Sequence, residues 1–353
     1  MDFKILEENA RALVVPGKGI LAADESIGTI GKRFDSISLE NTHENRFMYR
    51  NLLFTSDGIE KFISGVITFD ETFYDEKDGK RLIEPLLKKG IQVGIKVDMG
   101  VKIINSFGET VTQGLDNLDQ RTADYAAKGA TFAKWRGVLK IDTINNLPSE
   151  FAIEQNAQAL ARYAKICQEN GLVPIVEPEV LMDGDHTIEH AMEVTSRVLA
   201  VTYKALSDHG VYLPGTLLKP NMVRAGVESG VKFDANLIAK NTVMALQNAM
   251  PVSVPGVVFL SGGMSEAEAT ESLDAMNKLI AKKPWSLSFS YGRALQASCI
   301  KAFAGKVDNV QKAQEVLLER AHLNSLATKG EYESALETDK EALKSLYQKN
   351  YSY

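Results

Sequence analysis

Five charged residues interrupt short apolar runs of this sequence, and they are the residues best suited to chemistry. They are Lys134 and Arg136 in FAKWR, Glu177 and Glu179 in VEPEV, and Lys219 in LLKP. Side chains two positions apart in a β-strand point to the same side, so each motif aims its charges at one face. Because unpaired charges are costly to bury, we expect the five to be paired around a site that uses them. Simple mutual neutralisation of the two pairs is the structural alternative.

A lysine in such a setting can act as a nucleophile. Burial and neighbouring cations both disfavour the ammonium form, so the lysine loses its proton more readily than in water. A neutral lysine can attack a ketone and form a Schiff base, which allows an adjacent carbon–carbon bond to break or form without a metal. Nearby carboxylates can then carry the protons. The residue types leave open whether Lys96, Lys134 or Lys219 is the nucleophile.

Eight short apolar or β-rich runs alternate with long helical patterns, such as 149–170 and 188–210. Parallel strands need long crossovers, so this alternation predicts a (β/α)₈ TIM barrel in the α/β class. An open doubly wound sheet is the alternative, but the glycine-rich turn expected after its first strand is replaced by Asp24-Glu25-Ser26. The predicted strands cover 19–24, 63–70, 93–98, 132–137, 172–180, 215–220, 256–263 and 286–292.

Polar residues cluster near the carboxyl ends of these predicted strands, where the active sites of such barrels lie. The last two strands end in LSGG and SYGR, which combine glycines, backbone N–H groups and an arginine. These groups suit a phosphate, although the glycines could also be ordinary turn residues. Together with the lysine chemistry, they indicate a Schiff-base lyase or aldolase acting on a phosphorylated ketose. The polar residues at the other strand ends include Asp24, Asp70, Lys96 and Asp98.

The composition narrows the partners and the compartment. A net charge of -6 and the lack of a dense Lys/Arg stripe argue against a nucleic-acid partner. Cys167 and Cys299 have neither a metal-site spacing nor a disulfide framework, which suits a reducing compartment. Residues 1–14 indicate a first helix, and neither a targeting peptide nor a membrane span is expected. We therefore expect a cytoplasmic protein.

The sequence predicts one domain followed by a polar C-terminal segment. Residues 1–326 are predicted to form the barrel with its N-terminal helix, because no interior stretch resembles a linker. Residues 327–353 are polar, and we expect a short helix near 338–348 followed by a mobile tail.

The motifs GILAADES, GIKVD, FAKWR, VPIVEPE, ALSDH, GTLLKPNMV, FLSGG and FSYGRALQ resemble, in order and spacing, the class I fructose-1,6-bisphosphate aldolases. The similarity extends over nearly the whole chain. It implies a cytosolic (β/α)₈ barrel, usually a homotetramer, that uses no cofactor. It also implies reversible cleavage of fructose 1,6-bisphosphate to dihydroxyacetone phosphate and glyceraldehyde 3-phosphate, a step of glycolysis and gluconeogenesis.

The resemblance also implies a role for each residue that matches a family motif. Lys219 would form the Schiff base, Asp24 would be the base at the C4 hydroxyl, and Glu179 would be the acid/base for carbinolamine dehydration. Glu177 and Lys134 would assist. Further expected site residues are Lys96 and Arg136 in the charged pocket; Ser261, Gly262, Ser290, Gly292 and Arg293 at the C1 phosphate; Ser26, Thr29, Lys32 and Arg33 at the C6 phosphate; and Tyr353 for proton exchange at the enamine, with the tail reaching the site. Met99 departs from the family pattern, since a lysine is common there.

Other function classes stay open. His186 and His190 have the i, i+4 spacing of a metal-binding helix, near Asp183 and Asp185, although no suitable third ligand appears. A pyridoxal-phosphate enzyme would also need a lysine and a phosphate site. A scaffold is the non-enzyme alternative, since some members of the family bind actin or receptor tails.

Overall fold

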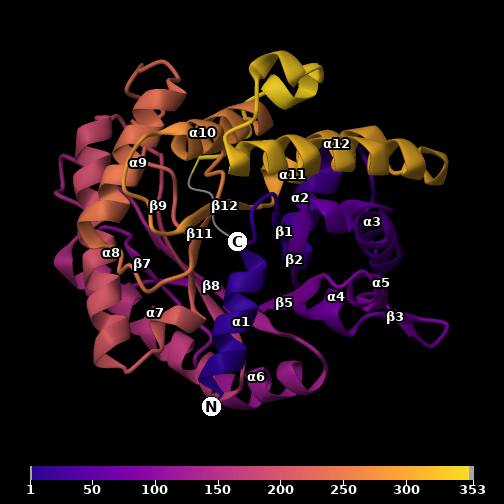
Figure 1. Cartoon of the computed structure of the whole chain (residues 1–353), viewed down its shortest axis with the longest axis horizontal. Coiled ribbons are helices and arrows are strands. Elements are labelled where there is room, and N and C mark those ends of the chain that lie inside the picture. Colours follow the sequence, from indigo (N-terminus) through magenta and orange to yellow (C-terminus); the bar gives the residue numbers. More distant parts are fainter. Residues whose placement is uncertain (1, 350–353) are drawn as a thin grey trace.

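The computed structural model describes residues 2–349, and its centre is a closed barrel of eight parallel strands (Figure 1). The barrel closes because β1 pairs with β2 on one side and with β12 on the other. This closure confirms the predicted (β/α)₈ barrel, and the open-sheet alternative is wrong. The barrel strands, in chain order, are β1 (Gly19–Ala23), β2 (Ile63–Thr68), β5 (Gln92–Lys96), β8 (Phe132–Leu139), β9 (Val173–Val180), β10 (Leu217–Leu218), β11 (Gly256–Phe259) and β12 (Ser286–Tyr291).

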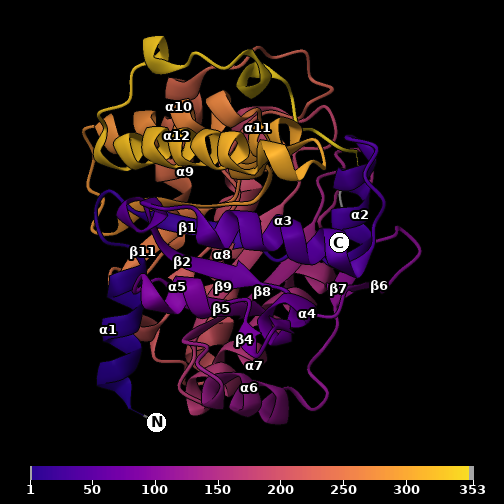
Figure 2. The same ribbon diagram turned by 90° about the vertical axis from the view of Figure 1, so that its right-hand side faces the viewer.

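Helices follow the strands and surround the barrel (Figures 1 and 2). The two helices predicted at 149–170 and 188–210 are confirmed, and the side chains of Ser149 and Thr187 cap their first turns. The α-helices are α1 (Phe3–Leu13), α2 (Ile27–Asp35), α3 (His43–Thr55), α4 (Asp70–Tyr74), α5 (Glu84–Lys88), α6 (Leu118–Ala127), α7 (Glu150–Glu169), α8 (Ile188–Asp208), α9 (Ala235–Ala249), α10 (Glu266–Lys278), α11 (Arg293–Phe303) and α12 (Val310–Lys329). Two hairpins, β3 (Glu76–Lys77) with β4 (Lys80–Arg81) and β6 (Val101–Ile103) with β7 (Thr110–Thr112), lie outside the barrel.

The helix α1 packs its apolar face against the interior of the barrel. Leu6, Ala10 and Leu13 belong to one buried cluster with interior residues of the strands, among them Phe132 and Val258. The helix α1 and the strand β2 approach each other closely at Gly65, since a Cβ on this residue would lie 2.6 Å from Leu13 Cδ2. The amino ends of the strands are therefore filled by apolar side chains, and polar chemistry is left to the carboxyl ends.

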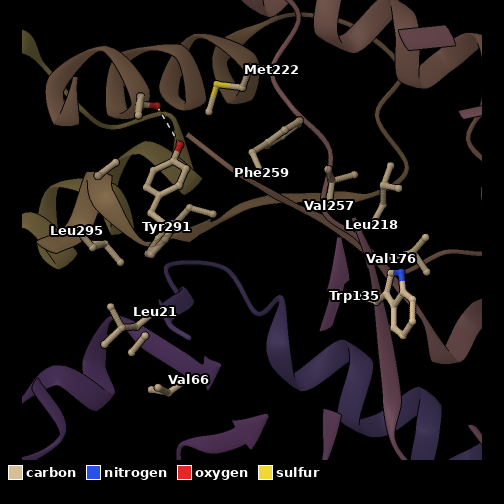
Figure 3. Packing of buried hydrophobic residues seen from close by; sticks show 14 of the residues in the cluster. Leu21, Val66, Trp135, Val176, Leu218, Met222, Val257, Phe259, Tyr291 and Leu295 are labelled. Atoms are coloured by element: carbon tan, nitrogen blue, oxygen red, sulfur yellow. Dashed lines mark hydrogen bonds between the residues drawn. The ribbon is translucent and has the colours of Figure 1, made fainter. Parts of the chain in front are cut away.

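A second, larger cluster packs the outer face of the strands against the helices (Figure 3). Trp135 belongs to it and stacks on Tyr163 of α7, with ring centroids 5.5 Å apart. Tyr291 of β12 reaches α10, where its hydroxyl donates to the carbonyl of Ala269 at 3.0 Å. Because side chains alternate along a strand, turning Trp135 outward turns Lys134 and Arg136 inward.

The segment after α12 is held to the barrel without an α-helix. It contains two 3₁₀ helices, Ser334–Leu336 and Lys340–Leu343, so the short helix predicted near 338–348 is present only over Lys340–Leu343 and in the 3₁₀ form. The segment has too few apolar residues to form an apolar helix face. Side-chain pairs fix its path instead, including Arg320 with Glu337 and Lys301 with Glu341. None of the helices within residues 2–349 combines the length and the apolar character that a membrane crossing requires.

Candidate active site

Lys134 lies at the centre of a buried cluster of charges inside the barrel. Its ammonium is 2.8 Å from Asp24 Oδ2, 3.4 Å from Glu177 Oε2 and 3.6 Å from Asp98 Oδ2. Asp24 and Asp98 follow β1 and β5, whereas Lys134 and Glu177 lie within β8 and β9, and the closed barrel brings the four together. The register aligns Lys134 of β8 with Lys96 of β5, so two cations share this level of the barrel.

The other predicted charges complete the same cluster. Lys219 Nζ lies 3.3 Å from the second oxygen of Glu177, and Arg136 Nε donates to Glu179 at 2.5 Å. Lys96 Nζ lies 3.0 Å from Asp98 Oδ1. Each cation thus has a carboxylate beside it, and the pairing expected from the sequence is confirmed. The sequence assigned no role to Asp98, although it placed Asp98 at the end of a predicted strand, two residues after Lys96.

The charge state of Asp24 follows from its neighbours. Burial by itself opposes ionisation of this carboxyl, but the ammonium groups of Lys134, Lys219 and Lys96 outweigh burial and hold its pKa well below the usual range. Asp24 is therefore a carboxylate near neutral pH. A carboxylate at this position can accept a proton from a hydroxyl that approaches from the mouth of the barrel.

A small cavity of about 30 Å³ opens above the charged cluster at the carboxyl ends of the strands. Loops after the last two barrel strands form one wall, as in the phosphate sites of this fold. Gly262 has φ of +60°, a conformation that other residues adopt only with strain, and its N–H belongs to a tight turn after β11. The predicted site residues that line this cavity are Asp24, Arg33, Arg136, Glu177, Glu179, Lys219, Ser261, Gly262, Ser290, Gly292 and Arg293. Lys96 and Lys134 lie beneath it.

A second cavity, of about 220 Å³, adjoins the first where Arg33 and Arg293 line both. Thr29 and Lys32 of α2 also line it, whereas Ser26 serves as the N-cap of α2 and contacts the Thr29 hydroxyl at 3.0 Å. Asp70 does not join the charged cluster and instead accepts a hydrogen bond from Tyr125 at 2.5 Å. A groove of about 690 Å³ between α3, α5 and the β3–β4 hairpin contains none of the predicted site residues.

The last described residues of the chain lie at the mouth of the site. Arg293 donates to the carbonyl of Leu346 at 2.6 Å, and the Tyr347 hydroxyl donates to Asp183 at 2.8 Å. Leu346 and Tyr347 also line the cavity of about 220 Å³. Tyr353 lies outside the described residues.

The histidine pair does not have the arrangement that a metal-binding helix would need. The helix α8 begins at Ile188 with Thr187 as its cap, so His186 precedes the helix and only His190 lies on it. Within residues 2–349, no group of three or more His, Cys, Asp or Glu side chains is arranged to hold a metal ion.

Comparison with known proteins agrees with this geometry. A family model described as fructose-bisphosphate aldolase class-I matches residues 5–353. The cytosolic fructose-bisphosphate aldolase 4 of Arabidopsis thaliana is 57% identical over 98% of this chain and 88% of its own length. The fructose-bisphosphate aldolase of Echinococcus multilocularis is also 57% identical, over 99% of this chain and 96% of its own.

A solved structure shares the fold at similar identity. The fructose-bisphosphate aldolase of Plasmodium falciparum, solved in complex with TRAP and a small-molecule inhibitor, superposes with a TM-score of 0.92 at 52% identity. The match covers 94% of this chain and 96% of that one. The chain therefore belongs to the class I fructose-bisphosphate aldolase family.

Proposed function

We propose that this chain cleaves fructose 1,6-bisphosphate through a Schiff base on Lys219. The chain is a fructose-bisphosphate aldolase, a lyase that reversibly forms dihydroxyacetone phosphate and glyceraldehyde 3-phosphate in glycolysis and gluconeogenesis. The observation that supports Lys219 is its place in the cavity beside carboxylates and the phosphate-type loops. Lys134 instead pairs with three carboxylates and does not line the cavity.

The first half of the reaction joins Lys219 to the sugar. Its neutral amine attacks the C2 ketone, and the resulting carbinolamine loses its hydroxyl as water to form the iminium ion. Glu179 would protonate that hydroxyl, and Glu177, 3.3 Å from Lys219 Nζ, would assist together with Lys134. Arg136, 2.5 Å from Glu179, orients that carboxyl.

The second half breaks the C3–C4 bond. Asp24 takes the proton of the C4 hydroxyl, glyceraldehyde 3-phosphate departs, and the bonding electrons pass into the iminium to form an enamine. The enamine then gains a proton at C3, a step we assign to Tyr353. Hydrolysis releases dihydroxyacetone phosphate and returns Lys219. We propose further that residues 327–353 form the tail that brings Tyr353 to the site.

The two phosphates would bind at the two cavities. Ser261, Gly262, Ser290, Gly292 and Arg293 would hold the C1 phosphate with hydroxyls, backbone N–H groups and one guanidinium. The residues proposed for the C6 phosphate are Ser26, Thr29, Lys32 and Arg33, and three of them line the second cavity.

Chemical trapping tests the assignment of Lys219. Borohydride added with dihydroxyacetone phosphate should reduce the Schiff base and label one peptide containing Lys219, which mass spectrometry can map. Lys219→Ala should remove both the label and turnover, whereas Lys204→Ala, at an exposed lysine of α8, should change neither. Asp24→Ser should keep the label but slow cleavage. Turnover by wild-type protein with Lys219 unlabelled would refute the mechanism.

Assembly and partners complete the proposal. We propose a homotetramer in the cytosol, in keeping with the cytosolic aldolases named among the plant relatives, and sedimentation velocity would measure the state. The Plasmodium falciparum structure is a complex with TRAP, which supports a role for protein partners in addition to the sugar phosphate. Binding to actin or a cytoskeletal adaptor is our proposal for such a partner.

A further inference from the structure

Glu25 follows the proposed base Asp24 directly, yet it is buried and lines neither cavity of the site. It lies in the loop between β1 and α2, and its side chain is 1% exposed. One carboxylate oxygen pairs with Arg33, and the other lies 2.5 Å from Arg50 Nη2. Glu25 is not among the residues that line the cavity above Lys219. A buried carboxylate placed between two arginines needs an explanation that the mechanism above does not supply.

Other buried groups fix the Glu25 carboxylate in place. Gln296 of α11 donates from Nε2 to Glu25 Oε1 at 3.1 Å and to the carbonyl of Ala22 at 2.8 Å. The Tyr49 hydroxyl of α3 donates to Gln296 Oε1 at 3.0 Å. The carboxylate is thus tied to β1, α3 and α11, and it offers Arg33 a rigid partner.

Arg33 is the partner of Glu25 that reaches the site. It lines both cavities at the mouth of the barrel, and its side chain is 15% exposed. A Cβ on Gly292 would lie 3.5 Å from Arg33 Nη2, so one edge of the guanidinium lies beside the phosphate-type turn while the other edge holds Glu25. Arg50, which is buried on α3, lines neither cavity.

Arg33 is the guanidinium of this cluster that an anion in the cavities can reach. Glu25 lies between the guanidinium groups of Arg33 and Arg50, and of these two arginines Arg33 is the one that lines the cavities. Glu25 therefore fixes a guanidinium at the wall of the site.

We infer that Glu25 is a positioning residue that holds Arg33 ready for the C6 phosphate of the substrate. This inference rests on the proposed function. An arginine side chain free to rotate loses that freedom on binding, and a guanidinium already oriented by a carboxylate loses less. The benefit appears only with a substrate that has a phosphate at C6. Fructose 1-phosphate, which lacks that phosphate, provides the internal comparison.

The first test is Glu25→Gln, which keeps the shape of the side chain and removes its charge. For fructose 1,6-bisphosphate we expect KM to rise by roughly tenfold, because the substrate must now order Arg33, while kcat stays within about twofold. For fructose 1-phosphate we expect both constants to stay near the wild-type values. Glu8→Gln, at an exposed glutamate of α1, is the matched control and should alter neither substrate.

A second variant separates positioning from folding. Glu25→Gln leaves Arg50 buried without its carboxylate, which costs stability, so Glu25→Gln/Arg50→Gln removes the buried charge as well. The double variant should regain wild-type thermal stability but keep the raised KM for the bisphosphate. In an Arg33→Ala background, Glu25→Gln should raise that KM no further, because its effect acts through Arg33.

The outcomes separate this inference from the proposed function. A wild-type KM for fructose 1,6-bisphosphate in the folded double variant, with borohydride labelling of Lys219 intact, would overturn the role of Glu25 alone. An equal rise of KM for both sugars would also overturn it, since the effect would not depend on the C6 phosphate. Absence of label at Lys219 in active wild-type protein would instead overturn the proposed function.

Discussion

Replacing Lys134 with methionine tests whether the charges inside the barrel hold one another in place. The ammonium lies 2.8, 3.4 and 3.6 Å from carboxylate oxygens of Asp24, Glu177 and Asp98. At an effective dielectric constant of about 20, these attractions amount to roughly 6, 5 and 5 kcal/mol. Burial of the ammonium and repulsion from neighbouring cations offset most of this. We therefore expect Lys134→Met to lower the free energy of unfolding by about 3–5 kcal/mol, the usual cost of breaking a buried pair.

Urea unfolding followed by far-UV circular dichroism measures this cost. The protein concentration must be held constant, since subunit association adds to apparent stability. Lys165→Met is the matched control, because Lys165 Nζ lies 3.5 Å from Glu169 at the surface of α7, where losing an ion pair costs about 0–1 kcal/mol. If Lys134→Met and the control lose the same free energy within about 1 kcal/mol, the reasoning is refuted.

The pH dependence of the difference provides a second readout. In the wild type the lysines, acting against burial, hold the pKa of Asp24 well below its usual range. Ionised Asp24 therefore contributes stability above its unfolded pKa near 4, and acidification removes that contribution. In Lys134→Met this contribution is smaller from the start. The difference between the two proteins should be constant above about pH 4 and narrow as the pH falls below that value, and a difference that stays constant from about pH 4 to pH 2 would exclude Asp24 as the main partner.

Two further predictions concern packing and buried acid. Gly94→Ala should lower the free energy of unfolding in urea by about 1–3 kcal/mol, because the added Cβ would lie 2.2 Å from the buried ring of Phe132. The control Gly28→Ala adds a Cβ where the space is open and should lower it by nothing. Equal losses of stability in the two variants would refute this account. Burial raises the pKa of Glu266 to about 7, so the folded state keeps a proton that the unfolded chain releases near the ordinary glutamate pKa of 4.5. The free energy of unfolding of the wild type should therefore fall by on the order of 3 kcal/mol between about pH 5 and 8. Glu266→Gln should not show this fall. Parallel pH profiles of stability in the two proteins would contradict the role of Glu266.

Local patterns along the chain predicted most of the fold. All eight apolar runs became barrel strands, because alternation and run length depend on neighbouring residues alone. The sixth run, 215–220, kept only Leu217–Leu218 as a strand, since a 3₁₀ turn precedes it and Pro220 has no N–H to extend the strand pairing. The helix expected near 338–348 is reduced to the 3₁₀ helix Lys340–Leu343 for a different reason. Contacts with distant side chains of the barrel fix that segment, and these contacts leave no local pattern.

The site was predicted in part. Spacing of two placed Lys134 with Arg136 and Glu177 with Glu179 on common faces, and the strand pairing aligns Arg136 with Glu177. The residue types alone did not decide which of the three lysines, Lys96, Lys134 or Lys219, is the nucleophile. The structure adds a distinction, because Lys219 lines the cavity while Lys96 and Lys134 lie beneath it.

The sequence by itself determined the strand and helix alternation, the inward face of each strand and the set of charges at the strand ends. The side-chain patterns behind these properties repeat over two to four residues, so a short window of sequence is enough to recognise them. Only the tertiary structure decided which charges meet. Asp24 and Lys134 are far apart along the chain, and they come within 2.8 Å because the barrel closes in one register. The same closure buries Glu25 against Arg33 and Arg50, a contact that depends on how α2 and α3 pack and not on any local pattern.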